Sequence, residues 1–92
     1  MDARIHEILN ITIEESSEVI QAISKIFRFG LDASWNGVTN REHLEEEIGD
    51  LKALILLLEQ NNVIDKDKVN EAAAAKIVKL QKWSTIFNGN DK

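Results

Sequence analysis

Carboxylates at a regular spacing are the side chains of this sequence that could act together in chemistry. Glu14, Glu15 and Glu18 form one group, and Glu47 and Asp50 form a second. Side chains three residues apart occupy neighbouring positions on one face of a helix. Oxygen ligands with no cysteine or histidine among them favour Mg²⁺, with Mn²⁺ as a possible substitute. The pattern therefore indicates a divalent-metal site, provided that both groups lie on helices that face each other.

The angular positions of these acids separate two of them from ordinary surface residues. At about 100° per residue, Glu15 falls at the edge of an apolar stripe and Glu47 falls inside a second one. Glu18 and Asp50 flank these stripes, roughly 60° further round. An ionised carboxylate on a core-facing stripe is costly unless a cation compensates its charge. A solvated acidic face remains an equally good explanation on this reasoning alone, and it is the better one for Glu14.

Three amphipathic helices must position these acids. Asp2 is a suitable N-cap for the first helix, and Gly30 is a suitable stop. Thr39 followed by Glu42, or Asn40 as the cap itself, starts the second. The helices are predicted over residues 3–29, 40–60 and 66–83. Short connections between them predict an all-α, antiparallel arrangement.

The length of the chain bounds its organisation. Its 92 residues suit a single helical domain, 1–92, with a polar tail at 88–92 that we expect to be frayed. So small a domain buries a modest core, and no cysteine is present to form disulfides. Three helices also leave an apolar face uncovered. We therefore expect a homo-oligomer, dimer or tetramer, in which a second copy completes a four-helix-bundle core.

Charge and hydropathy exclude two classes of partner. The net charge of −5 lacks the basic patch that a nucleic-acid-binding surface needs. The longest apolar run, from Ala53 to Leu58, is far too short to span a membrane. The first ten residues show no signal-peptide pattern. These features predict a cytoplasmic protein that binds neither nucleic acid nor membrane.

The third predicted helix also places a charged residue on its apolar stripe, but here the residue is a lysine. Lys76 lies on the apolar stripe of that helix, and Lys79 follows one turn later. Lys76 could extend past its apolar neighbours into water, as lysines often do. It could equally be a cation directed at phosphate oxygens.

The acidic segments resemble the signature of a known superfamily. Segments 14–18 (EESSE) and 47–50 (EIGD) are similar to the EExxE and ExxD motifs of the all-α nucleoside triphosphate pyrophosphatases. This superfamily includes dimeric dUTPases and phosphoribosyl-ATP pyrophosphohydrolase. The likeness is to short MazG-like proteins in particular, and it continues through 23–30 (ISKIFRFG), 40–51 (NREHLEEEIGDL) and 75–79 (AKIVK). It therefore extends over most of the chain.

The resemblance implies a function and a set of site residues. It implies Mg²⁺-dependent hydrolysis of an NTP or dNTP at the α–β phosphate bond, giving a nucleoside monophosphate and pyrophosphate. Lys76 and Lys79 would meet the phosphates, and Glu14 or Glu15 would accept the proton of the attacking water. The implied metal ligands are Glu15, Glu18, Glu47 and Asp50.

The loop between the first two helices supplies further candidates for substrate binding. Trp35 could stack on a nucleobase or fill a subunit seam. Arg28 could contact substrate, pair with a carboxylate or remain in solvent. Two other functions stay open: a non-catalytic helical oligomer that binds a protein partner, and a phosphoribosyl-ATP pyrophosphohydrolase. The metal motif cannot separate the last from the nucleotide enzymes, because both cleave an α–β phosphate bond.

Overall fold

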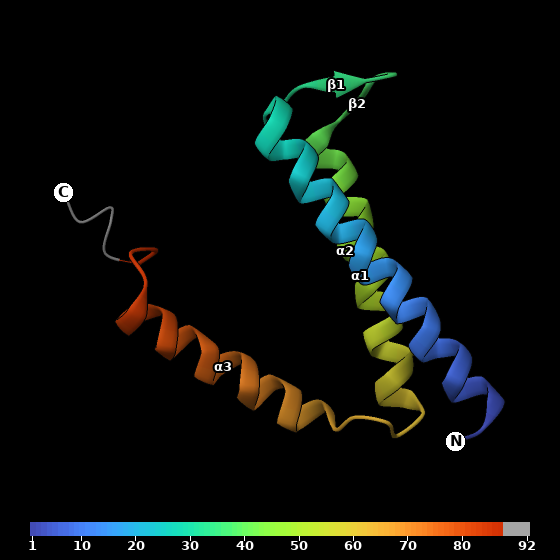
Figure 1. Ribbon diagram of the computed structural model, residues 1–92. Helices are drawn as coiled ribbons and strands as arrows, with labels where there is room; N and C mark the ends of the chain where they lie inside the picture. The colour runs from blue at the N-terminus through green and yellow to red at the C-terminus, as the bar shows by residue number, and fades with distance from the viewer. Residues whose placement is uncertain (88–92) are drawn as a thin grey trace.

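Three α-helices make up most of the described chain, with a short β-hairpin between the first two (Figure 1). The computed structural model describes residues 1–87, so the tail expected to fray at 88–92 lies outside the described part. The elements are α1 (Ala3–Phe29), β1 (Ser34–Trp35), β2 (Val38–Thr39), α2 (Asn40–Gln60) and α3 (Lys66–Trp83). The all-α fold class and all three predicted helix ranges are confirmed.

Polar side chains fix the beginning of each helix. Asp2 and Asp65 each accept a hydrogen bond from the backbone N–H three residues ahead, at 2.8 and 3.0 Å. Thr39 and Glu42 form the predicted capping box, in which each side chain accepts the other residue's backbone N–H. The Thr39 N–H, and then its hydroxyl, hold the pKa of Glu42 below its ordinary value.

The segment between α1 and α2 is a β-hairpin, where the sequence led us to expect only a loop. β1 and β2 pair antiparallel, with Trp35 opposite Val38. Asn36 and Gly37 between them have φ values of 54° and 81°, the left-handed conformation of a two-residue hairpin turn. The Asn-Gly pair is the sequence signal that could have revealed this hairpin.

The hydrophobic core lies at the end of the α1–α2 pair that is remote from the hairpin. Ile8 of α1 is buried against Leu54 and Leu58 of α2. Partly buried apolar side chains surround these three: Leu9, Ile11, Val63 and Ile64. Ala22, only 1% exposed, lies further along α1. Within the described residues, no helix has the length and hydropathy needed to cross a bilayer.

α3 extends away from the α1–α2 pair (Figure 1). None of its side chains is buried, whereas α1 and α2 pack along their lengths. The molecule measures 49 by 39 by 14 Å, so its shortest dimension is close to that of one layer of helices. A single chain therefore does not form a four-helix bundle. That a second copy completes such a bundle remains a prediction.

Candidate metal centre and adjoining cavity

Three of the four predicted metal ligands lie together between the two packed helices. α1 contributes Glu15, and α2 contributes Glu47 and Asp50. One carboxylate oxygen from each lies within 4.8 Å of those of the other two. This arrangement follows from antiparallel packing of the two acid-bearing faces. Three oxygens at this separation could share one divalent cation.

The other two acids of α1 lie around this trio. Glu18 is half-buried one turn further along the helix and falls outside the trio. Glu14 lies on the exposed side of α1. Both are nevertheless close enough for their charges to raise the pKa of Glu15. The cluster therefore has an inner group of three carboxylates and an outer pair.

Negative charges crowd the carboxyl group of Glu15. Burial raises the pKa of its carboxyl, and the negative charges of Asp50, Glu47, Glu18 and Glu14 raise it further, in that order. A divalent cation would reverse this effect by attracting each of these charges. The donor set therefore fits a hard cation such as Mg²⁺ or Mn²⁺, which prefers carboxylate oxygens.

A histidine holds the most buried of the acids. Glu47 is 8% exposed, and its Oε2 lies 3.0 Å from Nε2 of His43, one turn earlier on α2. With the proton on that nitrogen, His43 donates a hydrogen bond that fixes the Glu47 carboxylate. From the sequence, His43 reads as a surface residue. Its spacing of four residues from Glu47 was the signal that could have found this contact.

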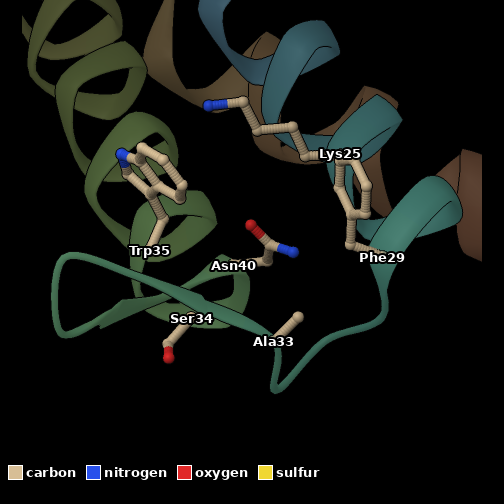
Figure 2. A pocket seen from close by; sticks show the side chains of 6 residues that line it. All are labelled: Lys25, Phe29, Ala33, Ser34, Trp35 and Asn40. Carbon is tan, nitrogen blue, oxygen red and sulfur yellow. The ribbon is translucent and has the colours of Figure 1, made fainter.

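An open cavity of about 380 Å³ lies where the end of α1, the hairpin and the start of α2 meet (Figure 2). An adjoining hollow of about 330 Å³ shares Lys25, Trp35 and Asn40 with it and continues to His43. His43 in turn contacts Glu47, so the cavity leads towards the acidic cluster. The residues lining the first cavity are Lys25, Phe29, Ala33, Ser34, Trp35 and Asn40.

The predicted substrate-binding residues fall into two groups. Trp35 lines the cavity, and the Arg28 guanidinium lies 5.3 Å from the centre of the Phe29 ring. Lys76 and Lys79 are exposed on α3, which stands apart from the helices that carry the acids. One chain therefore does not bring these two lysines to the acidic cluster.

Sequence reasoning missed Lys25, Phe29 and Asn40 as cavity residues. Lys25 and Phe29 follow Glu18 at seven and eleven residues, so all three lie on the same face of α1. That spacing was readable in the sequence. The part played by Asn40 was not, because it depends on how the hairpin folds back between the helices.

Comparison with known protein families gives a match over most of the chain. The profile of the MazG nucleotide pyrophosphohydrolase domain matches residues 4–84, which confirms the resemblance found in the acidic motifs. No curated protein and no solved structure matches the chain.

Proposed function

Because the chain belongs to the MazG nucleotide pyrophosphohydrolase family, a family of hydrolases, we propose that it cleaves nucleoside triphosphates in a Mg²⁺-dependent reaction. An NTP or dNTP is split at the α–β phosphate bond into a nucleoside monophosphate and pyrophosphate. The observation that carries this proposal is the trio Glu15, Glu47 and Asp50, whose oxygens gather within 4.8 Å of one another. A cavity of nucleobase-compatible size opens nearer the hairpin, where the end of α1 meets the start of α2.

The acids of both helices hold the metal in this proposal. Glu15, Glu47 and Asp50 supply the inner oxygens, and Glu18 supplies a further one from the next turn of α1. A bound Mg²⁺ would neutralise triphosphate charge and lower the pKa of a coordinated water. His43 keeps the Glu47 carboxylate in the orientation needed for binding.

Proton transfer falls to the acids of α1. The oxygen of water bonds to the α-phosphorus, the bond from that phosphorus to the bridging oxygen breaks, and pyrophosphate leaves. Glu14 or Glu15 accepts the proton released by the water. Glu15 lies among the acids that would hold the cation, whereas Glu14 has the more open position on α1.

The cavity and the cationic side chains contact the remainder of the substrate. Trp35 stacks on the base, and Arg28 approaches it from the end of α1. Lys76 and Lys79 meet the phosphates from α3. Since α3 does not reach the acids within one chain, these lysines act in the assembled oligomer.

A second copy of the chain completes the structure in this proposal. Ile13, Ile20 and Phe27 stand seven residues apart on the side of α1 away from α2, and they are 67%, 67% and 87% exposed. Large apolar side chains aligned in this way are typical of a helix–helix interface. A homo-oligomer, dimer or tetramer, buries them.

The test is a comparison of Glu47→Gln with Glu45→Gln. Glu45 is an exposed glutamate of the same helix and makes the matched control. Pyrophosphate release with Mg²⁺ should fall about 100-fold or more in Glu47→Gln, because a metal ligand is lost, and stay unchanged in Glu45→Gln. Helicity should be the same in both. Undiminished turnover of Glu47→Gln would contradict the proposed site.

The substrates should be a panel of NTPs, dNTPs and phosphoribosyl-ATP, with pyrophosphate as the common readout. Turnover of phosphoribosyl-ATP and of no other substrate would identify the chain as a phosphoribosyl-ATP pyrophosphohydrolase. A divalent cation that binds the folded state must raise the melting temperature. If neither Mg²⁺ nor Mn²⁺ does so and no substrate is cleaved, a non-catalytic, partner-binding role replaces the proposal.

A further inference from the structure

We propose that two copies of the chain exchange their third helices, so that α3 of each copy lies antiparallel along α2 of the other. This inference rests on the homo-oligomer of the proposed function and deepens it. It names the segment that crosses between the copies and the surface that receives it. In this arrangement Lys76 of one copy lies beside Asp50 of the other.

The apolar side of α3 has no partner within its own chain. None of the side chains of this helix is buried, and Ile77 and Trp83 are 46% and 82% exposed. A helix of 18 residues gains most of its stability from packing an apolar face against another surface. α3 therefore requires a surface that the α1–α2 pair of the same chain does not supply here.

The connection between α2 and α3 directs α3 away from its own chain. Val63 and Ile64 pack against the hydrophobic core, and the Val63 N–H donates a hydrogen bond of 2.9 Å to the carbonyl oxygen of Leu58. Asp65 then caps α3 by accepting the N–H of Lys68 at 3.0 Å. In Figure 1, α3 runs outward from this connection. Packing α3 on its own α2 would require these contacts to rearrange, whereas α3 of a second copy is free of that constraint.

A stripe on α3 matches a stripe on α2, residue by residue. At three, seven and ten residues before the last residue of α2 lie Leu57, Ala53 and Asp50. At three, seven and ten residues after the first residue of α3 lie Val69, Ala73 and Lys76. Spacings of four and three residues place each set on one face of its helix. Because both helices rise equally per residue, antiparallel packing pairs apolar with apolar, alanine with alanine and lysine with aspartate.

The distribution of charge favours the same arrangement. Residues 1–60 contain twelve acidic and five basic residues, whereas α3 contains five lysines and two acidic residues. Two α1–α2 pairs would therefore repel each other, and a positively charged α3 laid on each of them offsets this repulsion. Asp50, which pairs with Lys76 in the proposed register, is the exposed member of the acidic trio.

Disulfide trapping tests the exchange, since the chain has no cysteine of its own. In the proposed register Ala53 of one copy faces Ala73 of the other, and small facing residues allow the close approach that a disulfide needs. The full chain carrying both Ala53→Cys and Ala73→Cys should form covalent dimers under mild oxidation, as seen by denaturing electrophoresis without reductant. An intramolecular disulfide, or no disulfide, would overturn the inference.

Ala75→Cys in place of Ala73→Cys is the matched control. Ala75 lies roughly 200° round the helix from Ala73, so the covalent dimer should be lost. Equal yields from the two positions would show that α3 presents no fixed face, and would overturn the inference. Leu57→Cys with Val69→Cys is a second facing pair and should also give covalent dimers, so misfolding of one variant cannot protect the inference.

A charge reversal tests the register. Lys76→Glu, added to the Ala53→Cys, Ala73→Cys protein, places two acids together and should slow covalent dimerisation severalfold. Lys82→Glu makes the same change off the stripe and should leave the rate unaltered. Equal rates in both variants would overturn the pairing of Lys76 with Asp50.

Trapping requires neither metal nor nucleotide, which separates this inference from the proposed function. Covalent dimers from both facing pairs, with no hydrolysis of any triphosphate, would leave the exchange standing and remove the proposed activity. Hydrolysis by the native protein, together with intramolecular disulfides in both double variants, would retain the activity and remove the exchange.

Discussion

Glu15 carries a raised pKa because burial, and then the charges of Asp50 and Glu47, disfavour its ionised form. In the folded protein, protonation of this carboxyl is therefore easier than in the unfolded chain. Its contribution to stability is fully present below the unfolded pKa and is lost as the pH rises through the raised folded value. At neutral pH without metal, the ionised Glu15 opposes folding. Its position therefore lowers the stability of the metal-free protein, a cost that the proposed metal site would offset by binding a cation.

Replacement of Glu15 by Gln should reveal the destabilising effect of the ionised carboxylate in the absence of metal. At neutral pH without divalent metal, Glu15→Gln should melt at a higher temperature than the native protein, because one of the crowded charges is gone. The difference should vanish below pH 4.5, the ordinary pKa of a glutamate side chain. Mg²⁺ should raise the melting temperature of the native protein only. Glu7→Gln, at an exposed position, is the control. Equal melting temperatures of the native protein and Glu15→Gln in metal-free neutral buffer would contradict the claim that neighbouring charges destabilise the ionised Glu15.

The hairpin is the element that sets the geometry of the cavity. Its two-residue turn allows the chain to reverse within a few residues, which brings Trp35 back over the start of α2. Gly37 has a φ of 81°, where an L-amino acid with a Cβ is strained. An added Cβ would meet no atom within 4 Å, so a substitution there acts through backbone conformation alone.

Gly37→Ala and Gly49→Ala should therefore change stability in opposite directions. Gly37→Ala should lower the free energy of unfolding by about 1–2 kcal/mol, the cost of left-handed backbone. Gly49 is helical, and a Cβ there also meets nothing within 4 Å, so Gly49→Ala should raise it by about 0.5–1 kcal/mol. Urea denaturation measures both. Changes of the same sign would show that backbone conformation does not govern Gly37.

The sequence could predict features that depend on neighbouring residues, but not those that depend on contacts between distant parts of the chain. The start of α2 was predictable because Thr39 and Glu42 form a capping box within one helical turn. The helical periodicity of the apolar residues was enough to predict that Glu15 and Glu47 lie on inward faces. The contact of Asn40 with Gly30 spans ten residues and depends on the hairpin. The separation of α3 from the α1–α2 pair could not be predicted either, because an apolar stripe on a helix does not specify which surface that helix packs against. The roles of the site residues remain predictions.

The whole molecule is thin, and its apolar surface is incompletely covered. Ile13, Ile20 and Phe27 are exposed along α1, and α3 has no buried side chain. Trp83 at the end of α3 is 82% exposed. This much apolar surface is unfavourable for an isolated chain of this size. Association of copies would bury it and could carry Lys76 and Lys79 to the acids of another chain.

Ile20→Asp tests this assembly. A carboxylate in the middle of the proposed interface should weaken association at least roughly 100-fold, because a buried, unpaired charge costs several kcal/mol. Sedimentation should then show monomers at concentrations where the native protein is oligomeric. Gln21→Asp adds the same charge at the adjacent exposed position and should leave association intact. An unchanged sedimentation profile for Ile20→Asp would place the interface elsewhere.

The position of the core has a consequence for how the hairpin end responds to a ligand. Ile8, Leu54 and Leu58 hold the α1–α2 pair at one end, while Phe29 and Trp35 remain open at the other. Local unfolding should therefore begin at the hairpin, where few apolar contacts resist it. A base between the two rings would supply contacts that the polypeptide does not provide there. Occupancy and local order would then be thermodynamically coupled, and a bound nucleotide would complete the packing at that end of the molecule.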